Sequence, residues 1–261
     1  MPQFAANLSM LFTEVPFLER FALAREAGFE AVECMFPYGV EADSIAQRLE
    51  RHRLSLVLHN LPAGDWAAGE RGIACDPRRV GEFQDGVGLA LEYAGELGSP
   101  RLHCLAGKVP PGVAPERAHA TYVENLRFAA ARCADQGIEL LIEPINDRDV
   151  PGYLLTGTGQ AARIIAESGA PNLFMQYDIY HMQRMEGDLA ATLRERFALI
   201  RHIQLADVPG RHQPGTGEIH FPFLFRLLDE LGYEGWVGCE YVPQGETLAS
   251  LGWLEEARRG R

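Results

Sequence analysis

One unit recurs along the chain and constrains the fold more than any other feature: an amphipathic stretch, a glycine, and a short apolar run that ends in a carboxylate. Gly28 is followed by FEAVE, Gly137 by IELLIE and Gly232 by YEGWVGCE. Glycine often follows the last turn of a helix, and a short apolar run bounded in this way is typical of a buried strand. The chain is therefore expected to alternate helices and strands from end to end.

Eight segments fit the strand pattern, namely residues 4–8, 31–34, 54–59, 101–105, 138–143, 173–178, 202–207 and 237–240. At about 30 residues for each strand and helix, eight units fit a chain of 261 residues and favour a closed (β/α)8 TIM barrel. No Ser/Gly linker divides the chain, so residues 1–261 are expected to form a single domain. A doubly wound open sheet is less favoured, because no GxGxxG motif follows the first strand.

The charge balance argues against a nucleic-acid partner. The chain has 36 acidic and 24 basic side chains, a net charge of −12, and no dense run of Lys or Arg that could neutralise phosphates. Its five cysteines form no CxxC pair and are expected to be reduced thiols of a cytoplasmic protein. No signal peptide and no uninterrupted apolar window of membrane-spanning length is evident, so no membrane role is expected. A homo-oligomer stays possible.

Polar side chains end, or lie in, the last four predicted strands: Glu143, Asp178, Gln204 and Glu240. Successive members are 35, 26 and 36 residues apart, and each spacing fits one strand, loop and helix. In a TIM barrel the carboxyl ends of the strands surround one mouth, so these groups are expected to converge there. Crowded carboxylates repel one another, and a divalent cation relieves the repulsion. Oxygen ligands favour Mg²⁺ or Mn²⁺ over zinc.

Each of these residues also has an ordinary explanation, because a carboxylate after a strand is often a helix cap or a solvated loop residue. The case for a metal rests on all four together. His181 follows Asp178 by three residues and is expected to contact the substrate rather than the metal. His59 and His103 close the third and fourth strands and are candidates either for lining the site or for packing.

Two loop features are less specific. PGTGEI, residues 214–219, lacks the Lys-Ser/Thr of a P-loop, and we expect a tight turn that approaches a ligand through its backbone, with an ordinary glycine turn as the alternative. Trp66 lies in a long loop, where it either covers the site or packs against its rim.

The whole chain resembles the hydroxypyruvate isomerase family, within the xylose isomerase-like TIM barrels that also contain the ketose 3-epimerases. The resemblance is carried by five separate segments: NLPAGDWAAGERGIA (60–74), LIEPIN (141–146), QYDIYHMQRMEGDL (176–189), HIQLADVPGRHQPGTGEI (202–219) and GCEY (238–241). It implies that Glu143 and Glu240 are the acid/base pair and that the four strand-end residues hold the metal. It also implies that His181 and Arg211 lie near the substrate oxygens.

Two positions depart from the patterns of related proteins. Gln204 stands where related epimerases commonly have a histidine ligand, which separates this chain from the epimerase branch and leaves the metal open between Mg²⁺ and Mn²⁺. His220 stands where Asn is usual after GTGEI, and the sequence assigns this difference no consequence.

These features predict a metal-assisted aldose–ketose isomerisation of a small 2-oxo or hydroxy acid, hydroxypyruvate to tartronate semialdehyde (2-hydroxy-3-oxopropanoate), without nicotinamide or flavin. The substrate carboxylate needs a cation, for which Arg211 and Lys108 are candidates. The nearest alternative is a 2-oxo-tetronate isomerase or a ketose 3-epimerase acting on a longer sugar or sugar acid. A metal-dependent DNA phosphodiesterase on the same barrel would need more histidines and a basic surface. A non-catalytic binding protein is a further alternative.

Overall fold

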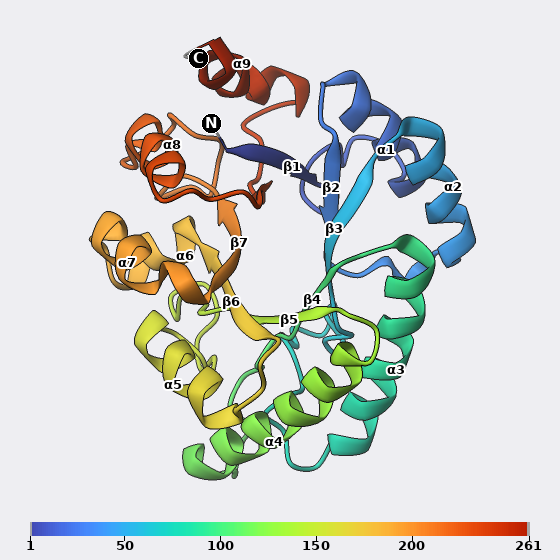
Figure 1. Ribbon diagram of the computed structural model, residues 1–261, viewed down its shortest axis with the longest axis vertical. Helices are drawn as coiled ribbons and strands as arrows, with labels where there is room; N and C mark the ends of the chain where they lie inside the picture. The colour runs from blue at the N-terminus through green and yellow to red at the C-terminus, as the bar shows by residue number, and fades with distance from the viewer. Residues whose placement is uncertain (1, 260–261) are drawn as a thin grey trace.

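The computed structural model describes residues 2–259 and shows a closed barrel of eight parallel strands surrounded by helices (Figure 1). Strands adjacent in sequence are adjacent in the barrel, and β1 pairs with β8 to close it. The strands are β1 (Gln3–Asn7), β2 (Ala31–Cys34), β3 (Ser55–Asn60), β4 (Arg101–His103), β5 (Glu139–Ile142), β6 (Leu173–Asp178), β7 (Ile200–Leu205) and β8 (Trp236–Cys239). The predicted single-domain TIM barrel is therefore confirmed.

Helices cover the outside of the barrel. The α-helices are α1 (Phe17–Glu26), α2 (Ala42–His52), α3 (Val80–Leu97), α4 (Pro115–Ala134), α5 (Thr158–Ser168), α6 (Ile179–Met185), α7 (Leu189–Arg196), α8 (Phe221–Glu230) and α9 (Gly252–Arg259). Short 3₁₀ turns lie at η1 (Pro37–Gly39), η2 (Phe197–Leu199) and η3 (Leu248–Leu251). Two α-helices, α6 and α7, separate β6 from β7, whereas single α-helices separate the other consecutive strands.

The predicted strands agree with the observed ones except at their ends. The fifth was expected to include Glu143, but β5 ends at Ile142. Pro144 has no N–H to donate to a neighbouring strand, so the ladder stops and Glu143 begins the following loop. This places the Glu143 side chain at the mouth of the barrel.

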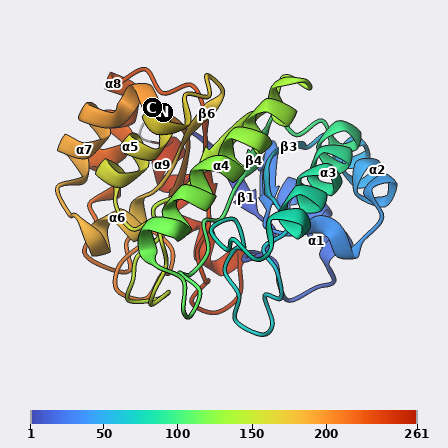
Figure 2. The ribbon, with the colours of Figure 1, turned by 90° about the horizontal axis from the view of Figure 1, so that it is seen from below.

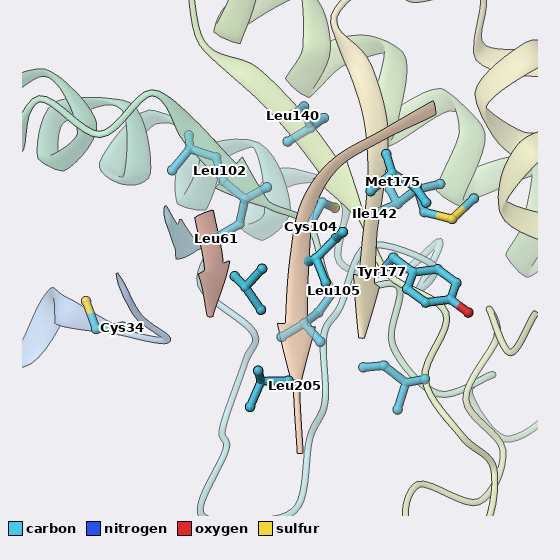
Figure 3. Close-up of a cluster of buried hydrophobic side chains, with 14 of the residues drawn as sticks. Cys34, Leu61, Leu102, Cys104, Leu105, Leu140, Ile142, Met175, Tyr177 and Leu205 are labelled. Atoms are coloured by element: carbon cyan, nitrogen blue, oxygen red, sulfur yellow. The ribbon is translucent and has the colours of Figure 1, made fainter. Parts of the chain in front are cut away.

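Apolar side chains fill two separate spaces. The larger core lies between the strands and the helices, and Figure 3 shows part of it, including Leu102, Leu140, Ile142 and Met175. A smaller cluster fills the amino half of the barrel and consists of Ala5, Ala31, Val57, Leu58 and Leu141, with Phe174 and Trp236 packed against it. Because this half is plugged, a ligand can enter only from the carboxyl ends of the strands.

The long connections gather at that end. Seen from the side, the segment between β3 and α3 extends past the barrel at the bottom of Figure 2. All five cysteines are buried and form no disulfide, as the sequence predicted. Within residues 2–259, no helix has the length and hydropathy of a membrane span.

Candidate active site

A polar layer crosses the barrel above the apolar cluster, and Glu33 of β2 lies at its centre. The Glu33 carboxylate accepts hydrogen bonds from Asn7 Nδ2 and Gln204 Nε2, each at 2.8 Å, and lies 2.6 Å from His202 Nε2. All four side chains are buried. Because a carboxylate can only accept hydrogen bonds here, it fixes the amide of Gln204 with its nitrogen toward Glu33 and its oxygen away.

Space for Glu33 is provided by a glycine of β8. A Cβ atom at Gly238 would lie 2.4 Å from both Glu33 carboxylate oxygens. Glu33 was not among the predicted site residues, although the repeat FEAVE places a carboxylate at the end of its strand. The prediction of metal ligands covered only the last four strands, although Glu33 follows the same pattern in the second strand.

The mouth of the barrel holds one cavity of about 460 Å³ whose walls include Glu143, Gln204 and Glu240. Asp178 lies fully buried at the end of β6, where its Oδ1 accepts the backbone N–H of Tyr180 at 2.7 Å and caps α6. The residues predicted to converge therefore do lie together. The capping role considered for such carboxylates is also present, because Asp178 offers one oxygen to the helix and the other to the site.

Three carboxylates in this space have perturbed acidities. Burial, with Glu240 and Asp178 nearby, raises the pKa of Glu143 well above its usual value. Burial also raises the pKa of Glu240 to about 8 and that of Asp178 to about 6. Groups that hold protons near neutral pH are suited to general acid/base work, or to exchange of protons for a cation.

Arg211 lies among these acids. Its Nη2 is 2.7 Å from Glu240 Oε2 and 3.6 Å from Asp178 Oδ2. The positive charge lowers the pKa of both carboxyls, against the larger effect of burial. The Arg211 backbone has φ of 56°, a left-handed conformation in the turn after β7.

His181 is held in one tautomer by Asn146. Asn146 Oδ1 accepts the N–H of Asp149 at 2.9 Å, which leaves its Nδ2 to donate to His181 Nδ1 at 2.6 Å. The proton of the neutral ring is therefore on Nε2, which lies 3.6 Å from Asp178 Oδ2 and 3.9 Å from Glu143 Oε1. Burial lowers the pKa of His181 well below its usual value, so the ring is a neutral donor facing the acids.

The donor set fits a hard cation. Glu143, Asp178 and His181 have potential ligand atoms within 4.8 Å of one another, but Nε2 of His181 carries the ring proton, so the carboxylates are the available ligands. Glu143 Oε1 and Asp178 Oδ2 are buried without a hydrogen-bond partner among the described residues. Unpaired buried oxygens of this kind are costly unless a cation or protons satisfy them. Gln204 fits less simply, because its Oε1 already accepts from Gln176 Nε2 at 2.6 Å.

Of the two other histidines predicted to contact the substrate, one lines the cavity and one does not. His103 lines the cavity, with Nε2 at 3.5 Å from Glu143 Oε2, and burial lowers its pKa to about 3. His59 instead faces α3, where its Nε2 lies 3.3 Å from the Ala90 carbonyl oxygen. Alternate residues of a strand point to opposite faces, so Asn60 rather than His59 faces the cavity. For His59, packing was the correct alternative.

Lys108 does not line the cavity. Its Nζ donates to the carbonyl of Gly69 at 3.0 Å, and its side chain is exposed. The expected contact with a substrate carboxylate is therefore not supported by its position. A lysine with a long flexible stem cannot be placed from its position in sequence, since the loop it reaches is set by the fold.

The PGTGEI loop is folded around Asp207. Gly215 and Gly217 donate their N–H groups to Asp207 Oδ2 at 3.0 and 2.9 Å. No residue of 214–219 lines the cavity among the described residues, so the expectation of a backbone approach to the ligand was wrong. His220 follows this loop at the start of α8 and borders a different hollow, between α8 and α9.

Trp66 both lines the cavity and packs on its rim, with its ring 5.0 Å from that of Phe36. Sequence reasoning missed several further lining residues: Asn7, Glu33, Asn60, Arg71, Asp149, Gln176 and Tyr180. Asp149 and Asn146 belong to the segment after LIEPI, whose polar residues were a usable signal. Arg71 had no distinguishing local pattern.

Comparison with known proteins gives consistent matches over the full chain. The family model described as xylose isomerase-like TIM barrel matches residues 21–257. A hydroxypyruvate isomerase from Escherichia coli (strain K12) is 53% identical over 258 residues, which cover 99% of this chain and 100% of that protein. A 2-oxo-tetronate isomerase from Cupriavidus necator is 51% identical over 98% of each chain.

A solved structure matches closely as well. The crystal structure of a protein described as AP endonuclease, family 2, from Brucella melitensis has a TM-score of 0.95 and 47% identity to this chain. The match covers 98% of this chain and 99% of that one.

Proposed function

The chain belongs to the hydroxypyruvate isomerase family of the xylose isomerase-like TIM barrels and is an isomerase, and from this premise we propose that it interconverts hydroxypyruvate and 2-hydroxy-3-oxopropanoate. The observation that carries this proposal is the pair Glu143 and Glu240, two buried carboxyls of raised pKa on the walls of one cavity. We further propose a cytoplasmic enzyme, in agreement with its five unpaired thiols.

The reaction needs two proton transfers at carbon. A proton leaves C3 of hydroxypyruvate, a planar enediolate forms across C2 and C3, and a proton returns at C2 while the O3 hydroxyl proton passes to O2. Glu143 and Glu240, from β5 and β8, serve as base and acid, and each well-placed group contributes about 10²- to 10⁴-fold. Which of the two begins in a given direction depends on the orientation of the substrate.

Other residues set the charges and hydrogen bonds. The Arg211 guanidinium holds the Glu240 carboxylate and keeps part of it ionised near neutral pH. His181 presents its Nε2–H to the cavity and donates to a substrate oxygen that gains negative charge. The smaller apolar cluster inside the barrel and Trp66 at the rim of the cavity limit the access of water to the intermediate.

We propose that Glu143, Asp178 and Glu240, with Gln204 at their side, hold a divalent cation, Mg²⁺ or Mn²⁺. When bound, the cation supplies electrostatic stabilisation of the developing oxyanion. The support is the unpaired oxygens of Glu143 and Asp178 and the crowding of acids around them. For Gln204 to take part, its oxygen must use its second lone pair or exchange its contact with Gln176.

A second candidate substrate, a 2-oxo-tetronate, is favoured by two observations. A cavity of about 460 Å³ leaves room beyond a three-carbon acid, and the Cupriavidus necator relative is named for this activity. Purified protein with Mn²⁺ is assayed on both substrates. A kcat/KM for hydroxypyruvate equal to or above that for the tetronate supports the first choice, and a preference of about 100-fold or more for the tetronate overturns it.

The phosphodiesterase alternative has less support. The one group of potential metal ligands found in residues 2–259 contains a single histidine, His181, and its ring nitrogens are arranged for hydrogen bonding. A histidine-rich cluster of several metals was the expectation for that chemistry. Cleavage of an abasic DNA duplex by the purified protein, at a rate comparable to its isomerase turnover, would reverse this ranking.

A further inference from the structure

The cavity is strongly acidic, and only two cationic side chains line it among the described residues, Arg71 and Arg211. Glu33, Glu143, Asp149 and Glu240 line it too. Arg211 is already neutralised, since one of its nitrogens contacts both Glu240 and Asp178. An incoming carboxylate would meet repulsion from these acids and needs a cation whose charge is not already paired.

Arg71 meets that requirement. Its guanidinium lies over the Trp66 indole, 4.0 Å from the ring centroid, and its Nη1 donates to the carbonyl oxygens of Trp66 and Glu70 at 3.2 and 2.6 Å. No carboxylate of the described residues forms an ion pair with it, and its Nη2 has no protein acceptor among them. One edge of a planar, oriented guanidinium is thus left for an anion, and such a group binds carboxylates in a defined geometry.

The loop that carries Arg71 is tied down in advance. Glu70 accepts the N–H of Asp65 at 2.5 Å and forms an ion pair with Arg79 at the start of α3. Gly72 has φ of 109° and lies so close to the segment after β4 that a Cβ there would be 2.5 Å from the Leu105 carbonyl oxygen. A preorganised loop of this kind loses little conformational entropy when its arginine binds a ligand.

We propose that Arg71, stacked on Trp66, binds the carboxylate of the substrate and so determines that this barrel accepts 2-oxo acids rather than neutral sugars. Arg211 then acts on the reacting end of the molecule, and Lys108 supports the loop through Gly69. The inference rests on the proposed function, because it assigns the carboxylate end of that substrate.

The test compares Arg71→Met and Arg71→Lys with a matched control, Arg78→Met. The control removes an arginine from the same connection between β3 and α3, where Arg78 is mostly exposed and pairs with Asp76, but it removes no cation from the cavity. Steady-state kinetics use hydroxypyruvate and, as a neutral counterpart, dihydroxyacetone. Calorimetry in the presence of Mn²⁺ measures binding of glycerate, which carries the carboxylate but has no carbonyl to react.

R71M is expected to raise KM for hydroxypyruvate and Kd for glycerate by about 10- to 100-fold, with a smaller change in kcat. Turnover of dihydroxyacetone changes by less than about 3-fold, R71K is intermediate, and R78M stays within about 2-fold of the wild type. Glycerate binding that R71M leaves intact, or a loss shared equally by R71M and R78M, overturns the inference. If the wild type turns over neither hydroxypyruvate nor the 2-oxo-tetronate but binds glycerate through Arg71, the proposed function fails and the carboxylate site stands.

Discussion

Arg211 Nη2 lies 2.7 Å from Glu240 Oε2 at the carboxyl end of the barrel, and the same nitrogen lies 3.6 Å from Asp178 Oδ2. One cation therefore serves two of the three acids in the site. Burial favours the protonated acids and the arginine favours the ionised ones, so their protonation is balanced near neutral pH. This balance allows a carboxyl group to take up a proton and release it within one turnover.

Glu240→Gln should lower kcat by about 10²- to 10⁴-fold, because the amide can neither accept nor deliver the proton at carbon. Its size and its contact with Arg211 are largely retained, so the thermal unfolding midpoint should stay close to that of the wild type. The measurement is hydroxypyruvate turnover with excess Mn²⁺. Activity equal to that of the wild type would place the acid/base chemistry elsewhere.

Arg211→Met should raise the pKa of Glu240 further, because it removes the charge that lowers it. The acid limb of the kcat/KM profile should move to higher pH, with an overall loss of about 10²-fold near pH 7. Arg211→Lys retains the charge and should return the limb toward the wild-type position. An unshifted pH profile in R211M, with lower activity at every pH, would mean that Arg211 only positions the substrate.

Asn146→Asp should reverse the tautomer of His181. An acceptor then faces Nδ1, so the ring proton moves to that nitrogen and the Nε2–H facing the cavity is lost. Turnover should fall by roughly 10²- to 10⁴-fold, as wrong-tautomer variants of other enzymes do. Imidazole ¹⁵N chemical shifts report the tautomer directly. If the shifts show Nε2–H in N146D, the assigned role of Asn146 is wrong.

In the metal-free protein, the free energy of unfolding should fall as the pH rises from about 6 to about 8. The folded-state pKa values of Asp178 and Glu240, about 6 and about 8, lie above those expected in the unfolded chain. The unfolded state ionises first on raising the pH, so unfolding is favoured progressively until both folded-state values are passed.

In EDTA, the unfolding midpoint should therefore drop by about 2–4 °C between pH 6 and pH 8. With saturating Mn²⁺ the drop should shrink or reverse, since the cation stabilises the ionised acids. Glu240→Gln should reduce the drop in EDTA, because of the two carboxyls it removes the one with the higher folded-state pKa. A midpoint in EDTA that is constant or rises over this range would contradict the assignment of raised pKa values.

Two glycine substitutions should have opposite effects on stability. A Cβ at Gly217 would lie 1.8 Å from the Val208 carbonyl oxygen and 2.7 Å from Asp207 Oδ1, so Gly217→Ala must distort the loop after β7. We expect a loss of about 1–3 kcal/mol in the free energy of unfolding. Gly88 lies inside α3 with nothing within 4 Å of its Cβ position, and Gly88→Ala should gain about 0.5–1 kcal/mol. Urea denaturation of both variants measures the difference.

The alternation of apolar runs and glycine-terminated helices determined the barrel and nearly every strand, because period and length depend on local chemistry. It also indicated that Glu143, Asp178 and Glu240 would meet, since in a barrel the strand ends share one mouth. Glu33 carried the same signal in the second strand.

Other parts of the site depended on contacts between segments far apart in sequence. His59 and Asn60 are neighbours, and the face on which each lies is set by the register of β3 against β4. The tautomer of His181 depends on Asn146, 35 residues away, and the placement of Arg71 depends on how its loop packs against the end of β4. Sequence fixes which chemical groups are available, but burial, hydrogen-bond partners and charge pairing arise only when the folded chain excludes water around them, and these decide which group can act.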